Sequence, residues 1–165
     1  MAGQMEVLSK EELKTRIGKR KAGERLDFRE RELEPMDLSG YDLSNMDFTL
    51  SSFQNVVLNG TDFSGSSVEN ALFDGCPLRV AVFLNACMKT ASFRHCDMRD
   101  CNIKGANLYG AILEYADLTG IQSDEATQWF RLRCPEKGAF LGYKKCFNNR
   151  LVQLLIPADA LRTSA

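Results

Sequence analysis

The stretch from Met36 to Gly120 reads MDLSG YDLSN MDFTL SSFQN VVLNG TDFSG SSVEN ALFDG CPLRV AVFLN ACMKT ASFRH CDMRD CNIKG ANLYG AILEY ADLTG. Written in groups of five, it makes seventeen pentads, and the central residue of every pentad is apolar. The position two residues before the centre holds mostly Ala, Cys or Ser, and the other positions hold mainly polar residues or Gly. A period of five fits neither the helical repeat of about 3.6 residues nor the alternation of a strand, so the stretch predicts a repeat architecture.

The two inward positions of a pentad lie two residues apart, which places both on one side of a short extended segment. The remaining residues must then turn the chain, and Gly ends seven of the pentads, where it supplies the positive φ that tight turns need. Large side chains recur every twenty positions, as in Phe53, Phe73 and Phe93. We therefore expect four pentads per coil and about four stacked coils, which form an all-β solenoid filled by apolar ladders.

The pentads resemble the pentapeptide-repeat family, whose motif is Ala, then Asp or Asn, then Leu and two variable residues. Ala106-Asn107-Leu108 and Ala116-Asp117-Leu118 match this motif outright, and the other pentads match its size pattern. The resemblance covers residues 36–120, roughly half of the chain. It implies a right-handed, four-sided β-helix, but it says little about function.

Both ends of a solenoid need caps, because they expose backbone edges and core. Residues 1–35 are expected to form a short capping helix, opened by the capping box Ser9-Lys10-Glu11-Glu12, and an irregular first coil with Arg31 in an inward position. Residues 121–165 are expected to form a capping helix over SDEATQWF, which places Trp129 and Phe130 on the core, and a β-hairpin built from GAFLGYKKC and RLVQLLIP.

The C-terminal stretch also resembles a small domain of unknown function that follows pentapeptide repeats in bacterial and phage proteins. The residues that carry this likeness are Cys134-Pro135-Glu136, Gly138, Phe140, Gly142, Lys144-Lys145, Leu154-Leu155-Ile156-Pro157 and Asp159-Ala160. The exposed strand of the hairpin and family precedent favour a homodimer through this region.

Composition excludes several classes of function. With 165 residues, 44% apolar and 26% charged, the chain is typical of a soluble folded protein, and no apolar run is long enough to span a membrane. The charged N-terminus does not resemble a secretory signal, so we expect a cytoplasmic protein.

Residues 1–35 carry nine basic and eight acidic groups, which argues against direct nucleic-acid binding. With a single histidine, His95, and no phosphate-binding loop, we expect no metal, no cofactor and no catalytic site.

The cysteines are expected to be reduced. Cys76 and Cys96 lie twenty residues apart and would stack within disulfide reach, but reduced packing residues are favoured in a cytoplasmic protein. Cys87 is expected to face outward and is the candidate reactive thiol. Cys134 and Cys146 lack the paired spacing of a zinc site.

Two functions remain, and both use the outer surface. The first is a non-enzymatic protein-interaction module, which binds a protein partner through the outward apolar residues Pro77, Val80, Val82 and Leu84, expected around one corner of the coil. The C-terminal hairpin is an equal candidate for covering these residues. The alternative is a DNA mimic that inhibits or protects a nucleic-acid enzyme, such as a topoisomerase or a phage-targeted nuclease. This alternative follows from a property of the resembled family and from residues 36–75, which hold six acids and no base. Its candidate residues are Asp37, Asp42, Asp62, Glu69 and Asp74.

Overall fold

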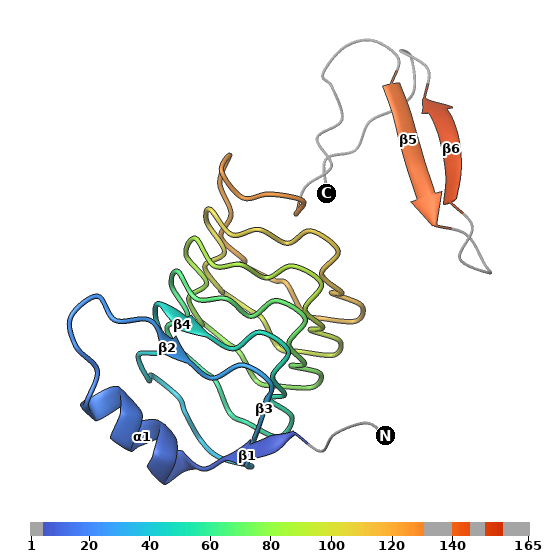
Figure 1. The fold of residues 1–165 in the computed structure, drawn as a ribbon. Coiled ribbons are helices and arrows are strands. Elements are labelled where there is room, and N and C mark those ends of the chain that lie inside the picture. The colour runs from blue at the N-terminus through green and yellow to red at the C-terminus, as the bar shows by residue number, and fades with distance from the viewer. Residues whose placement is uncertain (1–4, 131–139, 146–150, 157–165) are drawn as a thin grey trace. The chain divides into compact units, whose positions relative to one another are not determined.

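The computed structural model of the protein describes residues 5–130, 140–145 and 151–156 (Figure 1). The chain divides into two compact units, Met1–Phe130 and Arg131–Ala165. The first unit contains the named elements β1 (Glu6–Leu8), α1 (Lys10–Gly18), β2 (Leu26–Asp27), β3 (Arg31–Leu33) and β4 (Met46–Asp47). The second contains the strands β5 (Phe140–Lys145) and β6 (Leu151–Ile156).

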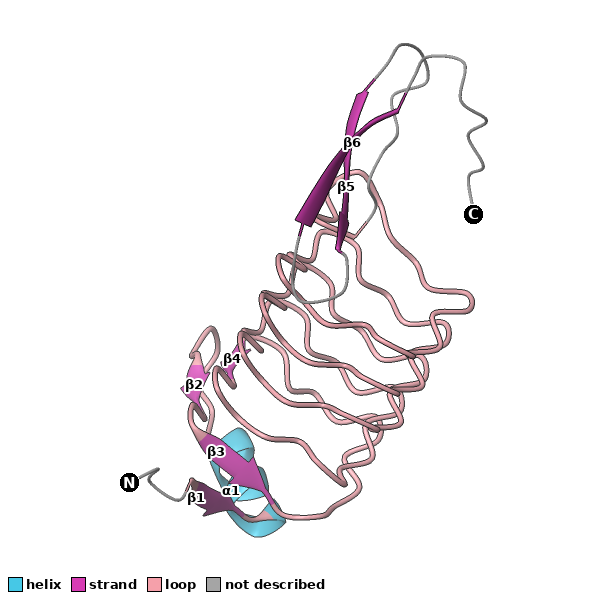
Figure 2. Ribbon diagram, turned by 90° about the vertical axis from the view of Figure 1, so that its right-hand side faces the viewer, coloured by secondary structure: helices cyan, strands magenta, loops and turns pink. Residues whose placement is uncertain are grey.

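The pentads wind into stacked coils (Figures 1 and 2). Parallel backbone bridges join residues twenty positions apart, for example Asp42 to Asp62 and Asp62 to Val82. Each bridge sits beside an inter-coil hydrogen bond, such as Phe63 N to Val82 O at 2.7 Å. One coil therefore takes four pentads, as the spacing of the large residues predicts.

The central residues of the pentads fill the inside of the stack. Phe73 is fully buried, and its ring stacks on those of Phe53 and Phe93 with centroids 4.4 and 4.8 Å away. The rings of Phe63 and Phe83 stack at 5.0 Å and meet Phe73 edge-on. Aromatic ladders running through successive coils are thus the main element of the core.

The small inward position also has a polar task. Ser66 Oγ donates a hydrogen bond to the carbonyl oxygen of Leu43 at 2.7 Å and accepts one from the backbone N–H of Met46 at 2.9 Å. Cys76 Sγ donates in the same way to the carbonyl of Phe53 at 3.0 Å. The position accepts Ser, Thr and Cys as well as Ala because their short donors meet backbone carbonyls inside the stack.

The N-terminal end is covered by α1, as predicted. Ser9 Oγ accepts a hydrogen bond from the N–H of Glu12 at 3.2 Å, and the side chain of Leu13, on the inner face of the helix, is fully buried. Arg16 places its guanidinium 4.2 Å from the centre of the Phe28 ring. Arg31, predicted at an inward position, is half-buried, and its Nη1 lies 3.0 Å from Glu6 Oε2.

The capping helix predicted for residues 123–130 is wrong. The segment forms turns, and Gln128 instead bridges to Asn107 of the coil before it. Asp124 explains the difference, because its Oδ1 accepts from the N–H groups of Gly105 and Thr127 at 3.0 and 2.9 Å and so fixes a turn. Trp129 is 68% exposed and does not cover the core, whereas Phe130 packs against it.

In the second unit, β5 and β6 pair antiparallel, with Phe140 opposite Ile156 and Lys145 opposite Leu151. These strands fall within the two runs predicted for the hairpin. The connecting residues, Cys134 and Cys146 lie outside the described residues. The homodimer through this region stays a prediction.

Candidate binding surface

Val80, Val82 and Leu84 lie on adjacent outward positions, and we call them the Val80 shelf. Val82 and Leu84 are two residues apart on one extended segment, and Phe83 between them is fully buried, so both face outward. Val80 ends the preceding pentad and is 50% exposed, while Leu84 is 38% exposed and Val82 is half-buried. The three predicted apolar residues are therefore at least partly exposed and follow one another along one outer side of the coil.

The backbone of Val80 is held in an unfavourable conformation. Its φ is 55°, in the left-handed region that β-branched residues rarely adopt. The equivalent corner of other pentads is usually Gly, as at Gly40 and Gly60, or Asn, as at Asn85. A β-carbon at Gly60 would lie 3.8 Å from Val80 Cγ2, so the valine lies beside an uncovered glycine of the coil before it.

The five predicted acidic residues are not brought together. Only Asp42 and Asp62 share a ladder, which continues to Val82. Asp37 pairs with Val57 on another side, and Glu69 and Asp74 belong to pentads on the remaining two sides, next to the Ser67 and Leu72 ladders. The acids of residues 36–75 are therefore spread around the coil and do not form one strip.

Most of these carboxylates also stabilise local turns. Oδ1 of Asp37, Asp42 and Asp62 accepts from the backbone N–H two residues later at 2.8, 2.9 and 2.8 Å. Hydrogen bonds from Ser39 and Ser44 hold the pKa of Asp37 and of Asp42 below the ordinary value, so both remain ionised at neutral pH.

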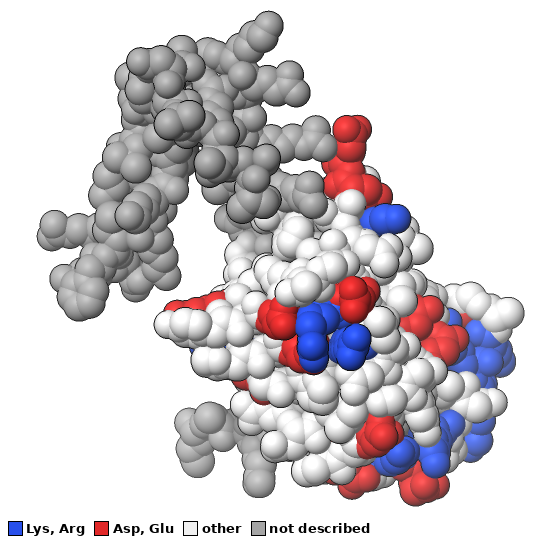
Figure 3. Space-filling model, turned by 180° about the vertical axis from the view of Figure 1, so that it is seen from behind, with Lys and Arg blue, Asp and Glu red and all other residues white. Residues whose placement is uncertain are grey.

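Acidic side chains further along the stack lie beside basic ones. Arg99 Nη2 lies 2.6 Å from Asp97 Oδ2, and its Nε lies 3.6 Å from Asp117 Oδ2 in the next coil. Arg94 Nε is 3.3 Å from Glu114 Oε2. Figure 3 shows this interspersion on the face that it presents, where red and blue side chains adjoin. These coils do not offer the uniform negative surface of a nucleic-acid duplex.

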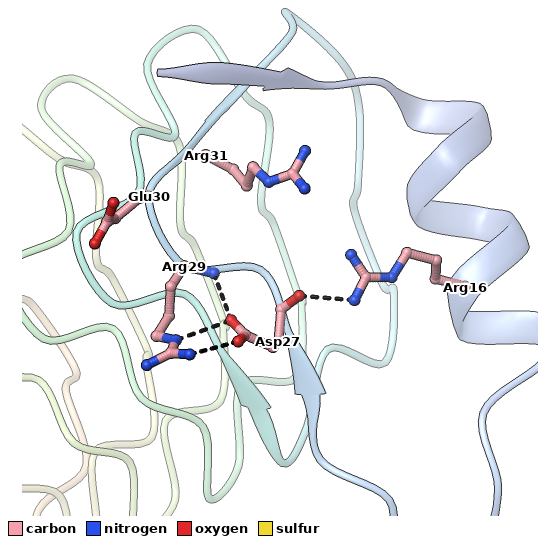
Figure 4. Close-up of a pocket in the computed structure, with 5 residues that line it drawn as sticks. All are labelled: Arg16, Asp27, Arg29, Glu30 and Arg31. Carbon is pink, nitrogen blue, oxygen red and sulfur yellow. Dashed lines mark hydrogen bonds and ion pairs between the residues drawn. The ribbon is translucent and has the colours of Figure 1, made fainter. Parts of the chain in front are cut away.

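A charged cleft of about 460 Å³ lies near the N-terminal end, between α1 and the first coil (Figure 4). Its lining residues are Arg16, Asp27, Arg29, Glu30 and Arg31. Arg29 forms a bidentate pair with Asp27, at 3.0 Å from Nε and 2.6 Å from Nη2, which lowers the pKa of Asp27 to about 2. Arg16 Nη2 donates to the carbonyl of Asp27 at 2.7 Å. The arginines that line the cleft thus bind groups of the protein itself, and the cleft is part of the N-terminal cap.

The cysteines and the histidine behave as packing or surface residues. Cys76, Cys96 and Cys101 are free and buried. Burial raises the pKa of Cys76 to about 11 and of Cys96 and Cys101 to about 12. Cys87 is half-buried, and its thiol donates to Glu69 Oε2 at 3.7 Å.

His95 is exposed and stacks on Tyr115 with centroids 5.0 Å apart. Among the residues that the structure describes, no group of three or more His, Cys, Asp or Glu is placed to hold a metal ion.

Residues 46–123 match the protein family described as pentapeptide repeat region. This segment is a pentapeptide repeat region. Residues 130–165 match a family of unknown function (DUF5758). No curated protein matches the sequence. In the described part of the chain, no helix is both long and apolar enough to cross a membrane.

Solved structures of pentapeptide repeat proteins share the fold. HetL from the cyanobacterium Nostoc, involved in heterocyst differentiation regulation, is 23% identical with a TM-score of 0.58, over 68% of this chain and 48% of HetL. A pentapeptide repeat protein from the Arabidopsis thaliana thylakoid lumen is 27% identical with a TM-score of 0.51, and the match covers 53% of this chain and 61% of the Arabidopsis chain. The chain thus spans about half to three fifths of these relatives. The likeness supports a right-handed β-helix solenoid.

Sequence reasoning missed several exposed apolar side chains outside the shelf. Leu50 is 47% exposed at a corner with φ of 63°, and Leu72 is 40% exposed. Tyr109, Tyr115 and Trp129 are 55%, 75% and 68% exposed near the end of the pentapeptide repeat region. Leu50 had a readable signal, because a large apolar residue at the last position of a pentad must turn outward. Trp129 had none, since its position depends on the wrongly predicted helix.

Proposed function

We propose that the protein is a non-enzymatic interaction module that binds a protein partner through the Val80 shelf. One observation carries this proposal: Val80 is half exposed, and it occupies a strained corner where glycine or asparagine stands in most other pentads. Neither the backbone nor the core benefits from a valine there, so a contact outside the chain is the simplest reason for it.

The non-enzymatic part of the proposal rests on how the reactive groups are used. The buried thiols of Cys76, Cys96 and Cys101 donate to carbonyl oxygens at 3.0, 3.0 and 2.9 Å, and their raised pKa values suppress the thiolate. His95 lies on the outside in a ring stack with Tyr115. These are structural and surface roles.

The DNA mimic is the second candidate, and the acid-only composition of residues 36–75 favours it. A mimic must present negative charge in a continuous row, as a phosphate backbone does. The distribution of Asp37, Asp42, Glu69 and Asp74 over different sides supports the shelf instead. A topoisomerase or phage-targeted nuclease would be the partner of a mimic.

The test compares two sets of variants in affinity capture from a bacterial lysate at low and moderate salt. The shelf set is Val80→Asn with Leu84→Ser, and the acidic set is Asp37→Asn, Glu69→Gln and Asp74→Asn. If the proposal holds, a partner captured by the parent is lost by the shelf set, is kept by the acidic set and resists moderate salt. A partner that is kept by the shelf set, is lost by the acidic set and is displaced by duplex DNA overturns the proposal in favour of the mimic.

A further inference from the structure

Two acids that form no ion pair with a described residue lie beside the Val80 shelf in the preceding coils. The ladder that contains Val82 reads Asp42, Asp62, Val82 and Asn102 in successive coils. Coils are separated by about 4.8 Å, so the two carboxylates lie about one and two coil spacings from Val82. Both acids therefore belong to the same surface as the shelf, although they are twenty and forty residues away in sequence.

The ladder next to that of Asp42 and Asp62 carries short side chains in the two coils before the shelf. The hydrogen bonds from Asn45 N to Ser64 O and from Gly65 N to Leu84 O align Ser44, Ser64 and Leu84 as the neighbouring ladder. Two serines thus stand where the next coil has a leucine. Short serine side chains therefore adjoin Leu84, and Asp42 and Asp62 lie two residues before them.

The carboxylates of Asp42 and Asp62 form no ion pair within the described residues. Each uses Oδ1 for its own turn, at 2.9 Å from Ser44 N and 2.8 Å from Ser64 N. Among the described residues, neither carboxylate forms an ion pair within 4.0 Å, although Arg20 is close enough to Asp42 to help lower its pKa. The acids of the later coils differ in this respect, since Asp97 and Asp117 share Arg99.

The opposite border carries charges of both signs, because Asp100 there is paired with Arg79 and Lys104 adds a positive charge. The hydrogen bond from Asn85 N to Lys104 O places Lys104 next to Leu84 in the following coil. Arg79, one residue before Val80, has its Nε 3.9 Å from Asp100 Oδ2. A ligand cation is therefore attracted more strongly toward the Asp42 border than toward the Lys104 border, which favours one orientation on the shelf.

We infer that the occupant of the Val80 shelf is a basic amphipathic segment of a partner protein, with an aliphatic side chain on the shelf and Lys or Arg beside Asp42 and Asp62. This inference rests on the proposed function, because it names the chemistry of the partner at the same surface. The aliphatic group supplies the anchor, and the cations supply register and direction.

The probe is a short fluorescein-labelled peptide of alternating leucine and lysine, titrated with the full chain and followed by fluorescence anisotropy. Two matched peptides replace every lysine by glutamate or every leucine by serine. The leucine–lysine peptide is expected to bind at least about tenfold more tightly than either of the others, with an affinity that falls as salt rises. Equal binding of the glutamate peptide, or no binding of the leucine–lysine peptide, overturns the inference.

Variants then separate this inference from the proposed function. Asp42→Asn with Asp62→Asn is expected to weaken the leucine–lysine peptide about threefold to tenfold and to remove most of its salt dependence. Asp37→Asn is the matched control, because that aspartate has the same turn contact on another side. If the shelf variants abolish binding while the double aspartate variant binds like the parent, the basic partner is wrong and the shelf stands.

Val80→Asn tests the shelf itself. Asn85 adopts a φ of 56° at the next corner of the same coil, so asparagine fits the backbone at position 80. We expect peptide binding to fall by about fivefold or more, while the urea midpoint stays unchanged or rises. Leu50→Asn, a similar change at another exposed corner, serves as the control and should bind like the parent. If both variants bind like the parent, the shelf has no role and the proposed function fails with the inference.

Discussion

Replacing Phe73 by alanine removes the middle ring of the longest aromatic ladder. The side chain is fully buried, stacks on two rings at 4.4 and 4.8 Å, and meets Phe63 and Phe83 edge-on at 5.9 and 6.4 Å. Truncating a buried phenylalanine costs about 3–5 kcal/mol, and loss of two stacked pairs places this variant near the upper end. That is a large part of the roughly 5–15 kcal/mol that stabilises a typical domain.

The assay is urea unfolding followed by circular dichroism, with Gln54→Ala as the control. Gln54 is exposed next to Phe53, and its truncation should change the free energy of unfolding by less than about 0.5 kcal/mol. Phe73→Asp, which places a charge in the same stack, is expected to prevent folding. If Phe73→Ala and Gln54→Ala unfold at the same urea concentration, the inward assignment of the central position is refuted.

The adjacent Asp74 is a poor control for this experiment, although it looks free in the sequence. Its Oδ1 accepts hydrogen bonds from Ser92 Oγ and from the backbone N–H of Arg94 in the next coil. Truncating it leaves both donors to water, so we expect Asp74→Ala to cost about 1 kcal/mol. The inter-coil contact is invisible until the twenty-residue register is known.

Further predictions concern the buried donors, the thiols, one surface ladder and the strained corner. Ser66→Ala should lower the free energy of unfolding by about 1–3 kcal/mol in urea titration, because a buried carbonyl and a buried N–H lose their partner. Arg99→Gln should move the midpoint of acid unfolding to higher pH. Arg99 holds the pKa of Asp97 at about 2, so the ionised carboxylate stabilises the fold above pH 4, and this stabilisation is lost as the pH falls toward 2. Val80→Asn should leave the free energy of unfolding unchanged or raise it by up to about 1 kcal/mol, because relief of the left-handed strain offsets the lost valine contacts. The contribution of the three buried thiols to stability should be constant below pH 9 and fall above it, because unfolded thiols ionise there but folded ones do not. Iodoacetamide at pH 8.5 should modify Cys87 before the buried thiols Cys76, Cys96 and Cys101.

The inside of the solenoid was predictable because its rule is local. A residue at the centre of a pentad points inward whatever its neighbours are, so Phe73 and Leu78 could be assigned from the period alone. The interval of twenty between large residues then fixed the number of pentads in a coil, and the backbone bridges confirm it. The N-terminal helix was equally readable, since its capping box Ser9 to Glu12 is contiguous.

The helix predicted for residues 123–130 failed because a local signal competed with a long-range one. Asp124 and Glu125 suggest a helix start, but the backbone of Gln128 finds a ladder partner in the coil before it, with Gln128 N donating to Ala106 O at 2.8 Å. Gln128 pairs with a residue twenty-one positions back instead of twenty, so the coil contains one extra residue. An insertion of this kind breaks the pentad phase and hides the continuing solenoid from a search for period five.

The outer surface could not be predicted from the order of residues alone, because neighbours on a side of the solenoid come from different coils. Acids that look clustered between Asp37 and Asp74 separate onto four sides, while Asp42 and Asp62 join Val82. The corners add a second criterion, since only a residue that tolerates positive φ fits there without strain. Val80 is unusual by both measures, being β-branched in a column that otherwise holds Gly40, Gly60 and Gly120 together with the ion-paired Asp100. Applying the register and the corner conformation together therefore selects one surface of this solenoid, where a strained and exposed side chain, two carboxylates that form no ion pair in the described part of the chain and two short serine side chains lie on neighbouring coils.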